Sequence, residues 1–351
     1  MKNILVTGAA GFIGTNLCHE LRKDNSNYVI GVDIKPYNPY IDAEDFDDYY
    51  SAYHSIDLRY KSDELNKLMS LADCVYHLAA DMGGMGFIKG NDVPIMINNN
   101  LIDINVISTA ADFDVRRVLY SSSACVYAER YQMDELHATK LAEDMAYPAD
   151  PQDGYGWQKL TTEKMIEGYR KEQKLDFRAV RFHNCYGPFG AWTGGREKAP
   201  AAMCRKVAMV DLGFTDTNTI EVWGTGTQLR SYMYIDDCVE GLQRIMNNVD
   251  YPGVCNLGYS GAISVDELLN TVADIAEQSI NIKHIDGPVG VASRDSDNTK
   301  FFFFYRWEPG ITPEEGLKET YAWIRNQVRK SQLVSKEPVP ETFVVPEDLE
   351  D

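Results

Sequence analysis

Short apolar runs alternate with amphipathic stretches along the first 125 residues of the chain. The apolar runs predict β-strands at residues 2–6, 28–32, 74–78 and 118–120. Between them, Phe12, Ile13, Leu17 and Leu21 recur at helical spacing, and residues 95–113 form a second helical stretch. Strands that alternate with helices indicate βαβ units. The sequence therefore predicts an α/β fold with a doubly wound parallel sheet and helices on both faces.

The second half of the chain is less regular. Its pattern predicts a helix at residues 152–174, a strand at 177–182, a strand end at 256–258 and a helix at 265–276. Residues 186–228 are dense in glycine, proline and charge, which suits loops and short helices of a ligand-binding cap. Residues 38–50 are rich in Asp and Tyr without a clear period and predict a loop.

Composition and charge narrow the class of protein. The chain has 351 residues, 44% of them hydrophobic, which is enough to bury a core. Its net charge of −19 disfavours binding to nucleic acid or to an anionic membrane, so an anionic ligand requires locally concentrated cations. No apolar run is long enough for a membrane span, and the N-terminal one is too short for a signal peptide. Seven scattered cysteines without a CxxC pair predict neither a disulfide framework nor a metal site, and favour the cytoplasm.

A GxxGxxG motif at residues 8–14 lies between the first strand and the first helix. Gly8 permits the tight turn, Gly11 lets backbone approach a pyrophosphate, and Gly14 lets the helix pack close to the sheet. Asp33 ends the second strand, where a carboxylate can accept hydrogen bonds from both ribose hydroxyls of NAD. Asp57 and Leu58 follow the next strand and could bracket the adenine. The motif therefore predicts NAD as the cofactor of a Rossmann-type domain.

Tyr155 and Lys159 form a YxxxK pair, which a helix places on one face. A tyrosine has a reference pKa near 10 and is a poor base at neutral pH. A neighbouring ammonium, together with the positive nicotinamide of NAD⁺, would favour the phenolate. Tyr155 could then accept a hydroxyl proton while a sugar carbon is oxidised. Ser123, after the strand about thirty residues upstream, is expected to hydrogen-bond the substrate oxygen beside Tyr155.

Several motifs occur in an order that resembles the extended short-chain dehydrogenase/reductase family, the NAD-dependent epimerases and dehydratases. They are GxxGxxG, Asp33, His77-Leu78-Ala79-Ala80, Ser121-Ser122-Ser123, YxxxK and Arg181-Phe182-His183-Asn184-Cys185-Tyr186-Gly187-Pro188. The resemblance covers about residues 1–330. It implies a smaller C-terminal α/β substrate-binding domain beside the Rossmann domain. The implied cofactor contacts are Gly8, Gly11, Phe12, Ile13, Gly14, Asp33, Asp57, Leu58, Leu78, Ala79, Ala80, Tyr155 and Lys159.

Within that family the chain resembles the GDP-mannose 3,5-epimerases. The similarity lies in residues 79–88, 122–127, 148–153 and 194–206, whose strings are long and unusual. It implies that oxidation of C4 to a ketone acidifies the hydrogens on C3 and C5, and that C4 is finally reduced again. The implied acid/base pair is Cys125 and Lys198. A thiol and an amine with an adjustable pKa suit proton exchange near neutrality.

The resemblance also implies a set of substrate contacts and a homodimer. The nucleotide diphosphate needs cations, for which the candidates are Arg205, Lys206, Arg230 and Arg294. The expected substrate contacts are Gly84, Met85, Ser123, Asn184, Glu197, Lys198, Lys206, Gln228, Arg230 and Arg294, with Gly83 in the same loop. The expected domains are 1–185 with 229–258 for NAD and 186–228 with 259–332 for the sugar nucleotide. Residues 333–351 are expected to form an acidic flexible tail.

Three alternatives stay open on the residues alone. One is another nucleotide-sugar epimerase, acting at C4 or on a GDP-heptose. A 4,6-dehydratase is disfavoured, because Ala124-Cys125 replaces the Asp-Glu pair expected there. A non-catalytic NAD-sensing protein should have a broken YxxxK, which this chain does not. Phe301 to Tyr305 and residues 130–146 do not match the family pattern; the first could pack internally or form an oligomer contact, and the second could alter sugar preference.

Overall fold

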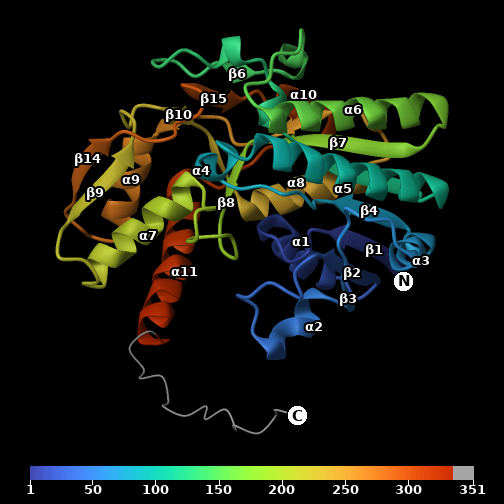
Figure 1. Ribbon diagram of the computed structural model, residues 1–351, viewed down its shortest axis with the longest axis horizontal. Helices are drawn as coiled ribbons and strands as arrows, with labels where there is room; N and C mark the ends of the chain where they lie inside the picture. The colour runs from blue at the N-terminus through green and yellow to red at the C-terminus, as the bar shows by residue number, and fades with distance from the viewer. Residues whose placement is uncertain (335–351) are drawn as a thin grey trace, which may run out of the picture.

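The computed structural model describes residues 1–334; residues 335–351, most of the predicted tail, lie outside the described residues. Its centre is a seven-stranded, all-parallel sheet in the order β12-β7-β5-β4-β1-β2-β3, which confirms the predicted fold class (Figure 1). The strands are β1 (Lys2–Thr7), β2 (Asn27–Asp33), β3 (Ala52–Ser55), β4 (Cys74–His77), β5 (Arg117–Ser123), β7 (Asp176–Phe182) and β12 (Cys255–Leu257).

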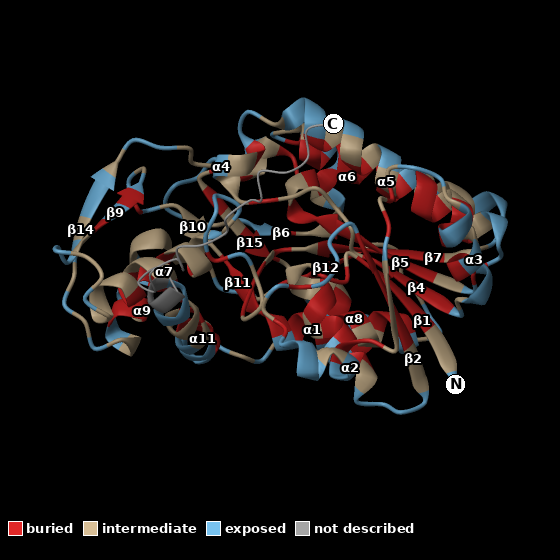
Figure 2. Cartoon of the chain, turned by 60° about the horizontal axis from the view of Figure 1, so that its bottom comes forward, coloured by how far each residue is buried: buried red, intermediate tan, exposed pale blue. Residues whose placement is uncertain are grey.

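Helices cover both faces of this sheet. In Figure 2, buried strands lie between α5 and α6 on one side and α1 and α8 on the other. Strands covered on both faces are continuously apolar, as in β4, where every residue is buried. The helices are α1 (Phe12–Arg22), α3 (Asp63–Leu71), α5 (Asp92–Asp112), α6 (Gly154–Glu172) and α8 (Ile235–Asn247).

A smaller group of elements lies at one end of the sheet (Figure 1). It contains the four-stranded sheet β13-β10-β15-β6 and the pair β14-β9, while β11 pairs with β8. Its elements are β6 (Lys140–Leu141), β8 (Asn184–Tyr186), α7 (Ala199–Asp211), β9 (Thr219–Trp223), β10 (Leu229–Arg230), β11 (Tyr232–Tyr234), β13 (Ile263–Ser264), α9 (Val265–Ile275), β14 (Asn281–Ile285), β15 (Ser293–Ser296) and α11 (Pro313–Val334). The helix α10 (Thr299–Tyr305) packs instead against β12 of the central sheet. Because β6 and β10 come from ranges expected in the NAD domain, the expected domain boundary runs through the four-stranded sheet.

Short helices form between the longer elements, and two of them lie in the predicted loop at residues 38–50. They are η1 (Ala43–Asp45), α2 (Phe46–Tyr49), α4 (Met85–Ile88), η2 (Ala124–Val126), η3 (Glu129–Tyr131) and η4 (Glu143–Ala146). The expected loop at residues 38–50 is corrected by α2, because its aromatic residues pack against the core. The Tyr50 hydroxyl, next to α2, donates to the Ala9 carbonyl oxygen at 3.0 Å. The expected short helices at 186–228 include the thirteen-residue α7, which packs against α9 and α11.

The carboxyl ends of the central strands meet at one edge of the sheet. β1 ends at Thr7, β2 at Asp33, β4 at His77 and β5 at Ser123. In open parallel sheets, ligands bind at this edge, and it is where the predicted cofactor motif lies. Within residues 1–334, no helix combines the length and the apolar composition needed to cross a lipid bilayer.

Candidate active site

The glycine loop between β1 and α1 is shaped by backbone packed against backbone. Gly8 has a positive φ of +70°, and a Cβ there would lie 2.8 Å from the backbone of Ala79. A Cβ on Gly14 would lie 2.1 Å from the Gly8 carbonyl oxygen, so the first turn of α1 sits directly on the loop. Gly11 precedes α1 and provides no side-chain cap, which leaves the amides of the first turn available to an anion. These features fit a dinucleotide pyrophosphate.

Asp33 lies at the end of β2 and is buried beside this loop. Its carboxylate accepts hydrogen bonds from the backbone amides of Ala10 and Lys35, each at 3.0 Å. Asp33 therefore fixes the glycine loop itself, a role that sequence reasoning missed. A carboxylate has further acceptor positions beyond these two, so the arrangement fits the predicted ribose contact.

A buried polar chain connects the glycine loop to α6. Thr7 Oγ1 contacts His77 Nδ1 at 2.8 Å, and His77 Nε2 contacts Asp103 Oδ1 at 3.1 Å. Asp103 Oδ2 accepts three more hydrogen bonds, from Tyr120 (2.6 Å), Gln158 (2.7 Å) and Thr162 (2.8 Å). Burial raises the pKa of Asp103, but attraction to Lys159 and to His77 and the hydrogen bonds outweigh it, so the pKa falls to about 2.

Lys159 lies fully buried above this carboxylate group. Its Nζ is 4.5 Å from the ring centroid of Tyr120 and 5.6 Å from that of Tyr155. This ammonium has no hydrogen-bond partner among the described residues. Burial lowers its pKa, while Asp103, Glu163 and Cys125 act in the opposite direction. An unpaired buried cation beside the YxxxK tyrosine fits a bound group that carries hydroxyls.

Tyr155 is buried beside Lys159, as the YxxxK spacing predicts. The expected lowering of its pKa does not come from the protein alone. Burial raises the pKa of Tyr155, the charge of Cys125 raises it further, and a hydrogen bond with Ser123 lowers it. Lys159 acts across the ring face instead of at the phenolic oxygen, which explains why its presence does not reverse the effect of burial.

Ser123 and Cys125 lie together where β5 passes into η2. The Ser123 hydroxyl oxygen accepts a hydrogen bond from the Cys125 amide at 3.1 Å, so Ser123 caps η2 and orients the cysteine. A Cβ on Gly156 would lie 2.2 Å from the Cys125 carbonyl oxygen, which shows how closely α6 approaches η2. Cys125 packs in one cluster with Tyr155 and with Met85, from the segment after β4. The structure therefore brings the predicted thiol and tyrosine together.

Two arginines lie side by side next to Cys125. Arg230 on β10 and Arg294 on β15 are register partners, and Arg294 Nη1 is 3.4 Å from Cys125 Sγ. Neither guanidinium pairs with a carboxylate within residues 1–334. Burial lowers the pKa of Arg230 to about 10, and the charge of Arg294 adds to this effect. Adjacent cations without an ion-pair partner in the described residues fit the predicted binding of a diphosphate.

Lys198 lies beside a second contact between two segments that are distant in the sequence. We call residues 81–88 the β4 loop and residues 194–198 the Lys198 strap. The Gly84 amide donates to the Arg196 carbonyl oxygen at 3.1 Å, and a Cβ on Gly84 would lie 2.4 Å from the Glu197 carbonyl oxygen. Lys198 is exposed, and its side chain makes no hydrogen bond or ion pair within the described part of the chain. The β4 loop thus shares a cluster with Cys125, through Met85, and lies against Lys198, through Gly84.

Comparison with known proteins agrees with these arrangements. The model of the "NAD dependent epimerase/dehydratase family" matches residues 4–258. The chain belongs to this family. Its NAD dependence agrees with the fit of the glycine loop, Asp33 and Lys159 to a dinucleotide.

Relatives in this family match nearly the whole chain. A protein named GDP-mannose 3,5-epimerase from Arabidopsis thaliana is 42% identical over 94% of this chain and 84% of its own length. GDP-mannose 3,5-epimerase 1 from Oryza sativa subsp. indica is 41% identical over 94% and 83%. The structure of a Thermotoga maritima UDP-glucose 4-epimerase matches with a TM-score of 0.78 at 24% identity, covering 93% of this chain and 99% of that one. This last likeness concerns the fold alone.

Other residues predicted from the sequence to contact a sugar nucleotide make contacts within the protein. Asn184 donates to the Ser231 carbonyl oxygen at 3.2 Å, and the Gln228 amide oxygen is buried without a partner in the described chain. Lys206 donates to the Glu221 carbonyl oxygen, and burial lowers the pKa of Lys206. Arg205 is held by Glu197 at 3.3 Å. Arg205 and Lys206 thus make protein contacts, and so do Arg230, which donates to the Val291 and Ala292 carbonyl oxygens, and Arg294, which donates to Gln132. Arg230 and Arg294 differ from Arg205 in having no carboxylate ion-pair partner within residues 1–334.

The predicted adenine contacts, Asp57 and Leu58, are both engaged in contacts within the protein. Asp57 forms an ion pair with Arg59 at 2.6 Å, and Leu58 is buried in the core beneath the sheet edge.

Phe301 and Tyr305 are buried on α10, while the side chains between them are exposed. The run therefore contributes both to internal packing and to the surface.

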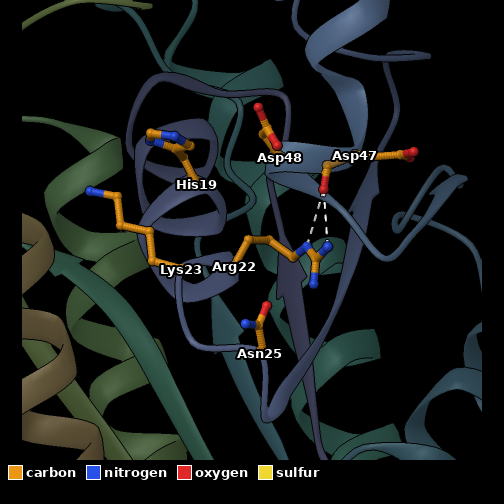
Figure 3. Close-up of a pocket in the computed structure, with 6 residues that line it drawn as sticks. All are labelled: His19, Arg22, Lys23, Asn25, Asp47 and Asp48. Atoms are coloured by element: carbon orange, nitrogen blue, oxygen red, sulfur yellow. Dashed lines mark hydrogen bonds between the residues drawn. The ribbon is translucent and has the colours of Figure 1, made fainter.

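A surface hollow lies at the far end of α1 from the glycine loop. About 350 Å³ in volume, it is lined by His19, Arg22, Lys23, Asn25, Asp47 and Asp48, as Figure 3 shows. Arg22 donates to the Asp47 carbonyl oxygen at 3.1 Å across it. None of the predicted site residues lines this hollow. Within residues 1–334, no group of His, Cys, Asp or Glu side chains is arranged to hold a metal ion.

Proposed function

We propose that this chain is an NAD-dependent GDP-mannose 3,5-epimerase, which converts GDP-mannose to GDP-L-galactose and GDP-L-gulose through a 4-keto intermediate. One observation carries the proposal: the β4 loop contacts both the Cys125 cluster and the Lys198 strap, beside Tyr155. A 4-epimerase needs only a redox cofactor and the tyrosine. A thiol and an amine around the same loop suit the additional exchange of protons at C3 and C5.

The cofactor would be held by the glycine loop, Asp33 and Lys159. When bound, NAD⁺ supplies a reversible hydride acceptor for C4. The first-turn amides of α1 would hold its pyrophosphate, and Lys159 would place its ammonium on ribose hydroxyls and beside Tyr155. Residues 78–80 would line the same space, because Ala79 packs against Gly8.

Tyr155 would accept the proton of the C4 hydroxyl and later return it. Burial raises the pKa of Tyr155, so the protein keeps the phenol protonated until cationic charge gathers around it. Ser123, whose hydroxyl accepts from the Cys125 amide, can donate its own proton to the substrate oxygen. The hydroxyl thus orients the thiol and the substrate at the same time.

Cys125 and Lys198 would exchange the protons on C3 and C5. Cys125 is partly exposed, and Lys198 is exposed and unpaired within the described residues, so each is free to reach a sugar ring between them. Arg230 and Arg294 would bind the diphosphate, with Asn184, Gln228 and Glu197 around the sugar nucleotide. Arg294 Nη1 also lies 3.4 Å from Cys125 Sγ, so the thiol would lie beside the bound diphosphate.

Incubation with GDP-mannose in D₂O tests this function. We expect deuterium at C3 and C5 of the hexose by NMR, together with products inverted at C5 and at both C3 and C5. Inversion at C4 without exchange at C3 or C5 would instead identify a 4-epimerase, and exchange restricted to a GDP-heptose would identify the heptose enzyme. If Tyr155→Phe turns over every tested sugar nucleotide as fast as wild type, a non-catalytic role replaces the enzyme.

We infer a homodimer from an apolar stripe on α5. Val93, Ile97, Leu101 and Ile104 are all exposed and recur at spacings of three and four, so they share one face of the helix. Light scattering of the purified protein should give twice the chain mass. Ile97→Glu should lower the measured mass toward that of one chain. A monomeric wild type would reject the dimer.

The cytoplasm and the two-domain division are parts of the same proposal. All seven cysteines lie within the described residues as free thiols, which suits a reducing compartment. The NAD-binding domain would comprise residues 1–185 and 229–258, and the sugar-nucleotide domain 186–228 and 259–332. The seven-stranded sheet falls within the first of these sets, which supports the division, whereas the four-stranded sheet takes strands from both sets, so the boundary would lie within that sheet.

A further inference from the structure

We propose that Arg196 is a positioning residue, which fastens the Lys198 strap to the β4 loop and so holds Lys198 over the sugar. The inference rests on the proposed function, because it assigns Lys198 a proton-transfer role. Arg196 itself need not touch substrate; it acts through the lysine two residues later.

The Arg196 side chain makes three contacts with the β4 loop. Its Nη1 donates to Asp81 Oδ1 at 2.9 Å and to the Met82 carbonyl oxygen at 3.0 Å. The guanidinium carbon lies 3.8 Å from the centroid of the Phe87 ring, a close cation–π stack. With the Gly84 amide on the Arg196 carbonyl, four interactions join two segments more than a hundred residues apart in sequence.

The partner carboxylate is itself held in place. Asp81 Oδ2 accepts from Asn98 Nδ2 at 2.9 Å, and the Asp81 amide donates to Asn99 Oδ1 at 2.6 Å. Both asparagines belong to α5, which packs on the central sheet. Arg196 therefore connects the strap to a rigid part of the fold, and not merely to another loop.

On its other side the strap begins with two glycines that restrain it little. Gly194 and Gly195 have φ angles of +89° and +85°, and an added Cβ on either would meet nothing within 4 Å. Their conformation, and not close packing, accounts for the glycines. Glu197 accepts from the Gly195 amide at 2.7 Å and pairs with Arg205 on α7 at 3.3 Å. Lys198 thus lies between an anchor on α7 and the Arg196 anchor on the β4 loop.

The contacts of Arg196 with the β4 loop, which we call the clamp, contribute little to the free energy of unfolding, because the Arg196 side chain is about half exposed. Its side chain keeps 48% of its accessible surface, and exposed ion pairs add little to folding. Precision of placement is different: displacement of a reacting group by about 1 Å can slow a reaction about 10²-fold. Loss of Arg196 should therefore spare folding and C4 oxidation, but slow the steps that need Lys198.

The test compares Arg196→Ala and Arg196→Lys with wild type in two partial reactions of GDP-mannose. Deuterium exchange at C3 and C5 should fall about 10²-fold in Arg196→Ala, with Arg196→Lys in between, because lysine keeps the charge but not the planar stack. Reduced cofactor, followed at 340 nm after rapid mixing, should form within threefold of the wild-type rate. A parallel fall in both reactions, or unchanged exchange, would overturn the proposal.

Arg244→Ala is the matched control. Arg244 on α8 keeps 39% of its side-chain surface, donates to Glu240 Oε1 at 2.9 Å and lies 5.4 Å from the centroid of the Trp307 ring, but no proposed catalytic lysine follows it. Its variant should retain both partial reactions, and a loss of exchange equal to that of Arg196→Ala would contradict a specific role for Arg196.

Hydrogen–deuterium exchange of the substrate-free protein separates the clamp from the proposed activity. The amides of residues 81–88 should exchange faster in Arg196→Ala than in wild type or Arg244→Ala. If wild type shows no deuterium at C3 or C5, the proposed function fails while faster amide exchange still supports the clamp. Unchanged amide exchange in residues 81–88 would overturn the clamp whatever the activity.

Discussion

Around the glycine loop, backbone packs against backbone, and buried side chains are joined by hydrogen bonds. A Cβ on Gly8 or Gly14 would overlap main-chain atoms, and Asp33 accepts two backbone amides. Around Lys198 the contacts are made by side chains at the surface, and the lysine itself has no partner in the described chain. The region around the glycine loop, which is the proposed cofactor side, is therefore built into the core. The region around Lys198, which is the proposed substrate side, is assembled from loops.

This difference has a chemical reason within the proposed function. A cofactor that stays bound through the reaction suits a preformed pocket whose shape is fixed by folding. A sugar that must be reached on two faces by two proton carriers needs side chains that are free to approach it. Substitutions on the two sides should therefore separate stability from activity.

Lys198→Ala should produce the largest effect, on activity alone. Epimerisation should fall about 10³-fold, since a positioned acid/base group contributes about 10² to 10⁴. Stability should change by less than about 0.5 kcal/mol, because no contact of the exposed side chain is lost. NMR of product formation and thermal unfolding measure the two quantities.

Lys89→Ala serves as the control for Lys198→Ala. Lys89 is another exposed lysine, at the end of α4, and its side chain makes no hydrogen bond within the described residues. Its variant should epimerise at the wild-type rate. If Lys198→Ala lost as much free energy of unfolding as its loss of activity corresponds to in free energy, the contrast between the two sides would be contradicted.

Gly14→Ala should damage the cofactor side through folding. Its Cβ would lie 2.1 Å from the Gly8 carbonyl oxygen, and both atoms belong to backbone that cannot move independently. We expect a loss of about 3 kcal/mol in the free energy of unfolding, together with loss of NAD binding. Denaturant titration and cofactor titration of the purified variant give both values.

Gly168→Ala is the paired change in an open position. Gly168 lies in α6, where an added Cβ meets nothing within 4 Å, so alanine should be neutral or stabilising by up to about 1 kcal/mol. Equal destabilisation by both substitutions would show that the close approach at Gly14 is not what limits the loop.

The elements of the proposed cofactor side could be predicted from the sequence because the information for them is local. Strand, glycines and helix follow one another within residues 2–22, and the YxxxK spacing alone puts Tyr155 and Lys159 on one face. The α2 helix was missed because Tyr50 gains its stability from a distant contact with Ala9. Local pattern carries no record of such partners.

The substrate side was predicted mainly by resemblance, and its supporting residues were missed. Arg196 and Asp81 are ordinary surface charges in the sequence, and only the fold brings them within 2.9 Å. Asp103 carried a usable signal: an acidic residue between Ile102 and Ile104 in an apolar stretch of helix. A charge in such a place is buried only with partners, but the sequence does not name them.

Asp103→Asn tests whether the buried polar chain supports the cofactor side. The pKa of Asp103 is about 2, below its ordinary 3.8, so its contribution is fully present above pH 3.8 and is lost as the pH falls through about 2. At pH 7 the variant should lose about 2.5 kcal/mol of stability, the equivalent of that difference. Urea titration at pH 7 measures this loss.

The expected mechanism of this loss is electrostatic as well as structural. An Asn oxygen can still accept from Tyr120, Gln158 and Thr162, and the amide can face His77 if that ring changes tautomer. What disappears is the charge facing Lys159. Were the variant as stable as wild type at pH 7, the carboxylate would not be needed to hold the buried ammonium.

His183→Gln should give the smallest effect, which appears only in how the free energy of unfolding changes with pH. His183 is buried after β7, and burial, followed by the charges of Arg294 and Arg181, lowers its pKa to about 3 from 6.5. Above pH 6.5 the ring is neutral in both states and costs nothing. Below pH 6.5, only the unfolded chain binds the proton, so the free energy of unfolding decreases as the pH is lowered to about 3. Between pH 8 and pH 5.5 this amounts to about 1.4 kcal/mol.

The variant should therefore lose less stability than wild type over that interval, whatever its absolute stability at pH 8. Gln can keep a hydrogen bond with Asn256, which the His183 ring contacts at 3.3 Å, so the core change is limited. Because Arg294 contributes to the shift, the measurement also reports cationic charge on the substrate side. Parallel stability curves for variant and wild type from pH 8 to 5.5 would mean that His183 is protonated in the fold, and that the arginine pair does not act on it.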